Sequence, residues 1–97
     1  MKIKLHAKAE QDLREALDYY FEIDAKLEKK FIALLEQTFN KISRFPNLYP
    51  FETKTAQKTL METFPYIIVY EKYEDIIMIL AIFHTSRSPI NLQGRTK

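Results

Sequence analysis

The sequence contains no cysteine and no tryptophan, and it has only one glycine among its 97 residues. Without cysteine, the chain has no disulfide framework, no thiolate zinc site and no cysteine nucleophile. It also lacks the run of roughly 20 apolar residues that a bilayer-spanning helix requires, and its first residues alternate charged and apolar side chains, unlike a signal peptide. We therefore expect a soluble, cytoplasmic protein with no membrane partner.

A large excess of one charge is also missing, because fifteen Lys and Arg residues stand against thirteen Asp and Glu residues. This balance argues against a polycation built as a whole for nucleic acid. The charges are unevenly placed, however. No acidic residue follows Asp75, whereas Arg87, Arg95 and Lys97 do. The C-terminal segment is therefore locally basic.

The remaining composition is that of one ordered globular domain, which we expect to span residues 1–97. Hydrophobic residues make up 46% of the chain and charged residues 29%, which suits a single core and leaves too little chain for two. Metal binding is not indicated, because the two histidines lie in separate predicted elements and no carboxylate cluster has ligand spacing. No cofactor is expected either.

Two segments in the first half repeat apolar residues at helical spacing. The first begins near Ala9, and acidic residues, among them Asp12 and Glu15, are assigned to its polar face. Asp24 is a suitable cap for the second, which Pro46 should end, because the residue before proline is pushed out of helical geometry. Only the three residues "EID" separate the two, so we predict an antiparallel helical hairpin.

Four segments have the pattern of strands: a short alternating segment at the start and three in the second half, the last two joined by a turn at "EKYED". This order predicts an α+β fold, strand-helix-helix-strand-strand-strand, with a largely antiparallel sheet and the N-terminal helical hairpin packed on one face. Leu60 is the expected apolar centre of the second strand. The predicted strands are 2–6, 58–63, 64–70 and 76–83.

Four motifs, in this order along the chain, carry a resemblance to a known family: "AEQDLREALDYY", "RFPNLYP", "FPYIIVY" and "ILAIFHTSRSP". From about residue 5 to residue 89, the sequence resembles the RelE/ParE toxin superfamily, in particular its ParE-like or plasmid-stabilisation branch. The resemblance implies the toxin of a type II toxin-antitoxin module, which a cognate antitoxin holds inactive. Members act on DNA gyrase or on mRNA in the translating ribosome.

The sequence departs from the family pattern at two places. The first helix starts with His6-Ala7 where many members have Ser-Pro, which changes only the helix cap. The second departure concerns function, because Ile67 stands where arginine is common. Ribosome-dependent members use several cations to stabilise charge on the scissile phosphate, so the loss of one weakens the case for RNA cleavage.

For an RNase, the resemblance implies catalytic roles for Arg87 as the phosphate-binding cation and His84 as the proton donor or acceptor. Lys54, Lys58 and Tyr66 are weaker candidates. Each has a structural alternative: His84 can bond a backbone carbonyl at the end of its strand, and the lysines suit a solvated loop edge. Arg87 can pair with an acidic residue such as Glu62, and Tyr66 fits the sheet with its ring.

Three hypotheses follow, and whether the protein is an enzyme stays open. The first is a ParE-like inhibitor of a target such as gyrase, which it contacts through Arg87, Arg95 and Lys97 without covalent chemistry. The second is a metal-independent, ribosome-dependent endoribonuclease, and the third is a member of the fold that has lost toxicity. Tyr19 and Phe21 fall off the apolar face of the first helix, so they either cap the core from the side or are candidates for antitoxin binding.

Overall fold

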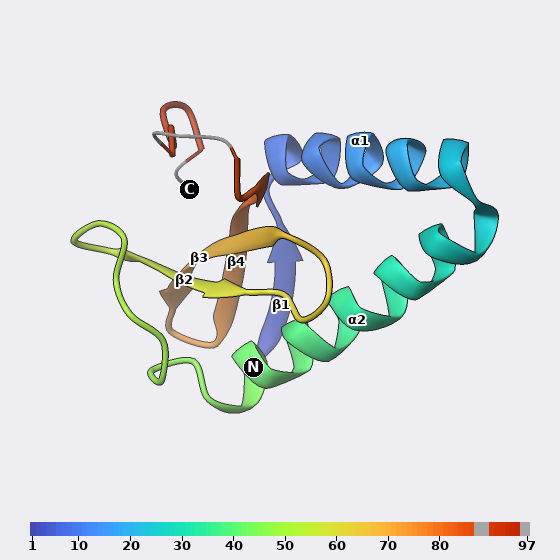
Figure 1. Cartoon of the computed structure of the whole chain (residues 1–97). Helices are drawn as coiled ribbons and strands as arrows, with labels where there is room; N and C mark the ends of the chain where they lie inside the picture. Colours follow the sequence, from blue (N-terminus) through green and yellow to red (C-terminus); the bar gives the residue numbers. More distant parts are fainter. Residues whose placement is uncertain (87–89, 96–97) are drawn as a thin grey trace.

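The structure, a computed structural model, describes residues 1–86 and 90–95. It confirms the α+β fold and the predicted order of elements, with two helices and one four-stranded sheet (Figure 1). Within the described part of the chain, no helix is long and apolar enough to cross a membrane. The elements are β1 (Lys2–Leu5), α1 (Ala7–Ile23), α2 (Ala25–Arg44), β2 (Ala56–Leu60), β3 (Tyr66–Tyr73) and β4 (Ile76–His84).

The strands lie in the order β1-β4-β3-β2. The pairs β2–β3 and β3–β4 are antiparallel, as a meander of short connections favours, whereas β1 pairs with β4 in parallel. In this parallel pair Lys2 lies opposite Ile76 and Leu5 opposite Ile79. The sheet is thus largely antiparallel, as predicted, and the first and last strands of the chain are neighbours.

Polar side chains at the helix starts fix where the helices begin and end. The side chain of His6 accepts a hydrogen bond from the backbone N–H of Lys8, at 3.1 Å, and so caps α1 without the Ser-Pro of the family pattern. Asp24 alone separates the helices: it ends α1 and its carboxylate caps α2 through the N–H of Lys26. The α2 helix ends at Arg44, two residues before Pro46, as predicted.

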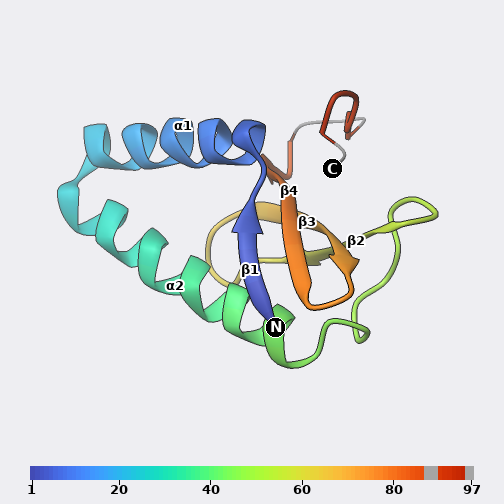
Figure 2. The ribbon, with the colours of Figure 1, turned by 180° about the vertical axis from the view of Figure 1, so that it is seen from behind.

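The two helices cover one side of the sheet, which we call the helix face, and spread into a V away from their connection (Figures 1 and 2). Four aromatic rings fill the space under this V. Phe31 is fully buried, stacks on Tyr20 at 5.4 Å between ring centroids, and meets Phe64 and Tyr66 edge to face. These contacts hold both helices to the start of β3.

The opposite side of the sheet, which we call the tail face, is covered by residues near the C-terminus. Ile90 and Leu92 pack against the apolar cluster of this face. A β-bulge in β4 adds one residue to this cluster. Val69 pairs with Ala81 and Tyr70 with Ile79, so Leu80 between them is the extra residue. The tail face cluster consists of Ala56, Val69, Leu80, Ala81 and Phe83.

The strand boundaries differ from the predicted ones in the second half of the chain. The β2 strand spans Ala56–Leu60 rather than 58–63, and Leu60, the predicted apolar centre, is 65% exposed at its end. The β3 strand runs on to Tyr73, so only Glu74 and Asp75 of "EKYED" form the turn. Glu71 misled the prediction: it is buried, and its carboxylate accepts a hydrogen bond from the Thr55 hydroxyl.

Candidate functional site

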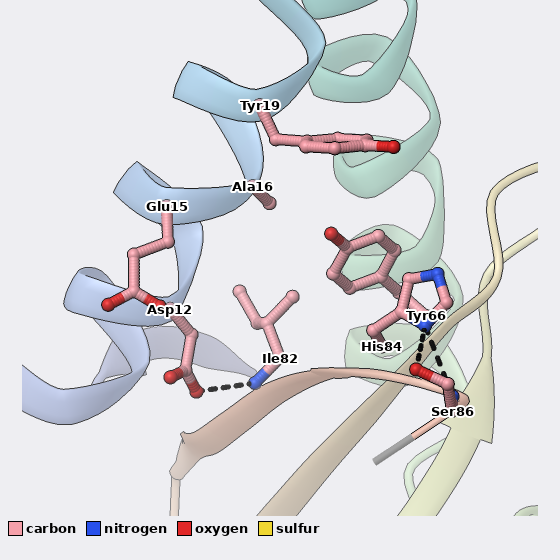
Figure 3. Close-up of a pocket in the computed structure, with 8 residues that line it drawn as sticks. All are labelled: Asp12, Glu15, Ala16, Tyr19, Tyr66, Ile82, His84 and Ser86. Atoms are coloured by element: carbon pink, nitrogen blue, oxygen red, sulfur yellow. Dashed lines mark hydrogen bonds between the residues drawn. The ribbon is translucent and has the colours of Figure 1, made fainter.

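A cavity of about 350 Å³ lies between α1 and the point where β4 leaves the sheet (Figure 3). Tyr66 at the start of β3 pairs with His84 at the end of β4, so both side chains stand on the helix face and face α1. Their rings meet edge to face at 5.3 Å. The eight lining residues are Asp12, Glu15, Ala16, Tyr19, Tyr66, Ile82, His84 and Ser86.

The hydrogen bonds of His84 define the form of its imidazole ring. The backbone N–H of Ser86 points at Nδ1 of His84, at 3.1 Å, and the Ser86 hydroxyl oxygen lies 2.8 Å from the same atom. A backbone N–H can only donate, so Nδ1 is the acceptor and the neutral ring carries its proton on Nε2. In this form, the ring offers a hydrogen-bond donor to its surroundings, and not a free basic nitrogen.

The tyrosines of this region form a connected group between helix and sheet. Tyr19 is 60% exposed and its ring meets that of Tyr20 at 5.1 Å, nearly perpendicular. Burial raises the pKa of the Tyr20 phenol, Tyr19 adds to the rise, and a hydrogen bond with Tyr66 opposes it. Tyr19 is therefore an exposed ring that packs against the buried ring of Tyr20.

Asp12 lies on the inner face of α1 and is buried. The sequence pattern had assigned it to the polar face of the helix, and this prediction was wrong. Its carboxylate is bound by both Nη atoms of Arg95, at 2.5 and 3.1 Å, and by the backbone N–H of Ile82 at 3.0 Å. The side chains of Asp12 and Arg95 are only 7% and 12% exposed. Three donors on one carboxylate explain why this charge can be buried.

Arg95 has further partners that fix it against the sheet. One Nη atom donates to the carbonyl of Leu80, the bulge residue, at 3.0 Å, and the guanidinium lies 4.6 Å from the centre of the Phe83 ring. Gly94, at a positive φ of 74° that suits glycine, forms the turn that brings Arg95 back to α1. The guanidinium predicted to bind a target is thus engaged within the chain, and its role in target binding stays a prediction.

The other predicted site residues are not gathered at one place. Of the described candidates, His84, Tyr66 and Tyr19 line the cavity. Lys58 lies on β2, where it pairs with Glu52 at 2.7 Å, and it lines a different, apolar pocket with Ile67. Lys54 is exposed in the bend before β2.

Arg87 and Lys97 lie outside the described residues. Ile67, in place of the family arginine, packs against the tail face. Glu62, an acidic residue suggested as a partner for Arg87, forms an exposed pair with Lys41 at 3.1 Å. Phe21 is 55% exposed on α1, as its position off the apolar face predicts.

Sequence reasoning missed the three remaining polar lining residues, Asp12, Glu15 and Ser86. The signal for Asp12 was its spacing, because it lies three residues after buried Ala9 and four before buried Ala16. Ser86 carried no signal beyond its place two residues after His84. No group of three or more His, Cys, Asp or Glu side chains in residues 1–86 and 90–95 is arranged to hold a metal ion.

The fold and this cavity define a class of small α+β proteins in which a helical pair covers one face of a four-stranded sheet. The family model described as ParE toxin of type II toxin-antitoxin system, parDE, matches residues 3–89. The chain therefore belongs to the ParE toxin family. A search of curated proteins finds no match.

A solved structure with the same fold is that of the chromosomal ParDE TA system from P. aeruginosa. The two chains superpose with a TM-score of 0.75 over 87% of this chain and 95% of the other, at 20% sequence identity. Because the identity is low, this likeness establishes the fold alone.

Proposed function

We propose that this protein is the toxin of a type II toxin-antitoxin module, that it stops growth by binding an essential target such as DNA gyrase, and that a cognate antitoxin neutralises it. The observation that carries the proposal is the match to the ParE toxin family over residues 3–89, nearly the whole fold. Binding through the locally basic C-terminal segment, with Arg87 as the main contact, requires no covalent chemistry and no cofactor.

Two observations favour a binding toxin over the alternative, a ribosome-dependent endoribonuclease. RNA cleavage without a metal needs cations that converge on the scissile phosphate. Among the described candidates, Lys58 is paired with Glu52 on β2, and the arginine position after Tyr66 is occupied by apolar Ile67. These side chains line a different pocket from that of His84.

The second observation is the state of His84. A general base at Nε2 needs a free lone pair on that atom, whereas the hydrogen bond from Ser86 places the proton of the neutral ring there. Proton transfer by this ring would first require Ser86 to release Nδ1. The arrangement therefore supports a binding role for His84.

The first test is regulated expression of the protein in a bacterial host, followed within minutes by mapping of mRNA 5′ ends and by an assay of plasmid supercoiling. Purified toxin is then added to purified gyrase. Lost supercoiling with intact mRNA is the expected result. Codon-phased mRNA cleavage would replace this proposal with the RNase alternative, and the absence of any growth arrest would leave a non-toxic member of the family.

Variants separate binding from catalysis. Arg87→Ala should abolish growth arrest, while Arg14→Ala, which removes an exposed arginine from α1, should leave it unchanged and serves as the matched control. His84→Gln should spare a gyrase inhibitor, because glutamine keeps a hydrogen-bond donor, and should cripple an RNase. Growth arrest that persists in Arg87→Ala would contradict the assignment of this residue.

Antitoxin binding is proposed to involve α1, where three large apolar side chains are more than half exposed: Tyr19, Phe21 and Ile23. An apolar segment of the partner would cover these three side chains. The gene expected beside this one should encode that partner, and its co-expression should restore growth. Tyr19→Ser with Phe21→Ser should weaken this rescue without lowering toxicity.

A further inference from the structure

One end of α1 shows how this protein accommodates a guanidinium group. Arg95 is held by a carboxylate, that of Asp12, and by an aromatic ring, that of Phe83. The carboxylate neutralises the charge, and the ring face attracts the cation and covers its flat surface. The same helix thus contains a guanidinium site whose occupant is the chain's own arginine.

The cavity next to this site offers the same chemistry one turn along α1. Glu15 and Tyr19 lie three and seven residues after Asp12 on the same side of the helix, and both line the cavity. Tyr66 and His84 supply aromatic rings from the sheet (Figure 3). A carboxylate beside aromatic rings is again present. No described residue forms an ion pair with Glu15, whose carboxylate accepts one long hydrogen bond, from the Gln11 side-chain amide at 3.5 Å.

The floor of the cavity suits the rest of an arginine side chain. Ala16 and Ile82 contribute apolar surface between the carboxylate and the rings. Figure 3 shows Tyr19 on the helix side and Tyr66 on the sheet side of the open space. The hydrocarbon stem of an arginine can lie on the apolar floor while its head reaches Glu15 and a tyrosine ring.

The charge of the described lining residues favours a cation over a phosphate. The two acidic lining residues are Asp12, which Arg95 neutralises, and Glu15, which stays unneutralised by any described cation. The α1 helix as a whole carries five acidic residues against two basic ones. This excess attracts a basic partner and disfavours the anionic backbone of a nucleic acid.

We propose that this cavity binds an arginine side chain carried by a protein partner. We identify this partner as the antitoxin, and that identification rests on the proposed function. The binding of a guanidinium group in the cavity does not depend on it. Arginine is preferred to lysine because its planar head stacks on tyrosine and forms two hydrogen bonds with one carboxylate.

The test is an NMR titration of the whole protein with N-acetyl-arginine methylamide, followed through the ring signals of Tyr19, Tyr66 and His84. Saturable shifts of these signals are expected, and the citrulline analogue, which has the same shape without the charge, should produce none. Equal shifts with citrulline, or shifts with adenosine monophosphate and none with the arginine probe, would overturn the proposal.

Variants locate the binding site. Glu15→Gln should weaken binding of the arginine probe roughly tenfold, since it removes a charge-assisted contact. Glu22→Gln, an exposed acid on the same helix that does not line the cavity, is the matched control and should bind like the natural protein. Equal affinity of the two variants would overturn the assignment. Both positions are exposed, so the fold should survive, and the remaining spectrum checks this.

Two further arms identify the source of the arginine. Binding that is seen only in the Arg87→Gln protein would overturn the partner assignment, because the chain's own arginine would then occupy the cavity. For a toxin that binds the probe, Glu15→Gln should also weaken the complex with the antitoxin. If the protein binds the probe but causes no growth arrest and no antitoxin for it is found, the proposed function is refuted and the guanidinium site still stands.

Discussion

The two faces of the sheet are stabilised in different ways. On the helix face, aromatic rings from α1, α2 and β3 interlock, and Phe31 at their centre is completely buried. On the tail face, a few residues near the C-terminus cover the apolar cluster, and the ion pair of Arg95 with Asp12 joins them to α1. Close packing thus stabilises the helix face, whereas an ion pair and hydrogen bonds attach the C-terminal residues that cover the tail face.

This difference bears on function because a face that is held by few contacts is the easier one to rearrange. The tail carries Arg95 and directly follows the segment that contains Arg87. A partner that competes for Asp12 or for the apolar cluster would release the cover without disturbing the aromatic core. Substitutions on the two faces test whether they are stabilised in these different ways.

Phe31→Ala should lower the free energy of unfolding by about 3–5 kcal/mol, because it removes the ring at the centre of the helix face and leaves a cavity. Leu92→Ala, on the tail side, should cost only about 1 kcal/mol, since this side chain is partly exposed. Urea denaturation measures both values. Phe51→Ala, which truncates a ring that is 61% exposed, is the control and should change stability by less than about 0.5 kcal/mol. Equal losses for Phe31 and Leu92 would contradict the comparison.

Arg95→Met should cost about 3 kcal/mol, because it leaves the buried carboxylate of Asp12 with the Ile82 N–H as its remaining described donor. The double variant Asp12→Leu/Arg95→Met should recover only part of this loss, because the buried Ile82 N–H then loses its carboxylate acceptor. Lys41→Met breaks an exposed pair, with side chains 52% and 67% exposed, and should cost under about 0.5 kcal/mol. If Arg95→Met is no more harmful than this control in the same denaturation assay, the ion pair does not secure the tail.

Tyr70 gives the helix face a dependence on alkaline pH. Its hydroxyl donates to the carbonyl of Pro46 at 2.6 Å, and burial raises the pKa of this phenol from 10.0 to about 12. The folded protein therefore holds the proton more tightly than the unfolded chain, so this stabilisation is complete below pH 10 and is lost as the pH rises toward 12. The two-unit difference corresponds to about 2–3 kcal/mol.

The measurement is urea denaturation at several pH values between 9 and 12, roughly the window of the shift. Lysines also lose their charge in this range, so the informative quantity is the difference between the natural protein and Tyr70→Phe. That variant should lose less stability across the window. Tyr19→Phe, on an exposed ring, should follow the natural protein, and identical slopes for all three proteins would refute the role of Tyr70.

The sequence allowed prediction of what depends on local pattern. Both helices were predictable because apolar residues recur every three or four positions and because Asp24 and Pro46 mark boundaries. The parallel pairing of β1 with β4 was not predictable, since it joins strands at opposite ends of the chain. The same holds for Asp12, whose partner Arg95 lies 83 positions away, so an acidic residue within a helical stripe looked solvated.

The candidate site was only partly predictable for the same reason. The abrupt end of an apolar strand identified His84, and an aromatic residue off the apolar face identified Tyr19. That these two share a cavity with Glu15 depends on the crossing of α1 over β4, which no local pattern encodes. In the sequence, Lys54 and Lys58 resembled members of a cationic cluster. In the structure, Lys54 lies in the bend before β2 and Lys58 on β2, and their distance from His84 depends on the order of the strands.

The parallel pair of β1 and β4 also has a consequence for synthesis of the protein. The β1 strand leaves the ribosome before the other described strands, but its neighbour in the sheet is β4, the last of them to be synthesised. Contacts so distant along the chain form late in folding. A nascent chain that has not yet released residues 76–84 therefore lacks a complete sheet, so the domain can fold only after all four of its described strands have been synthesised.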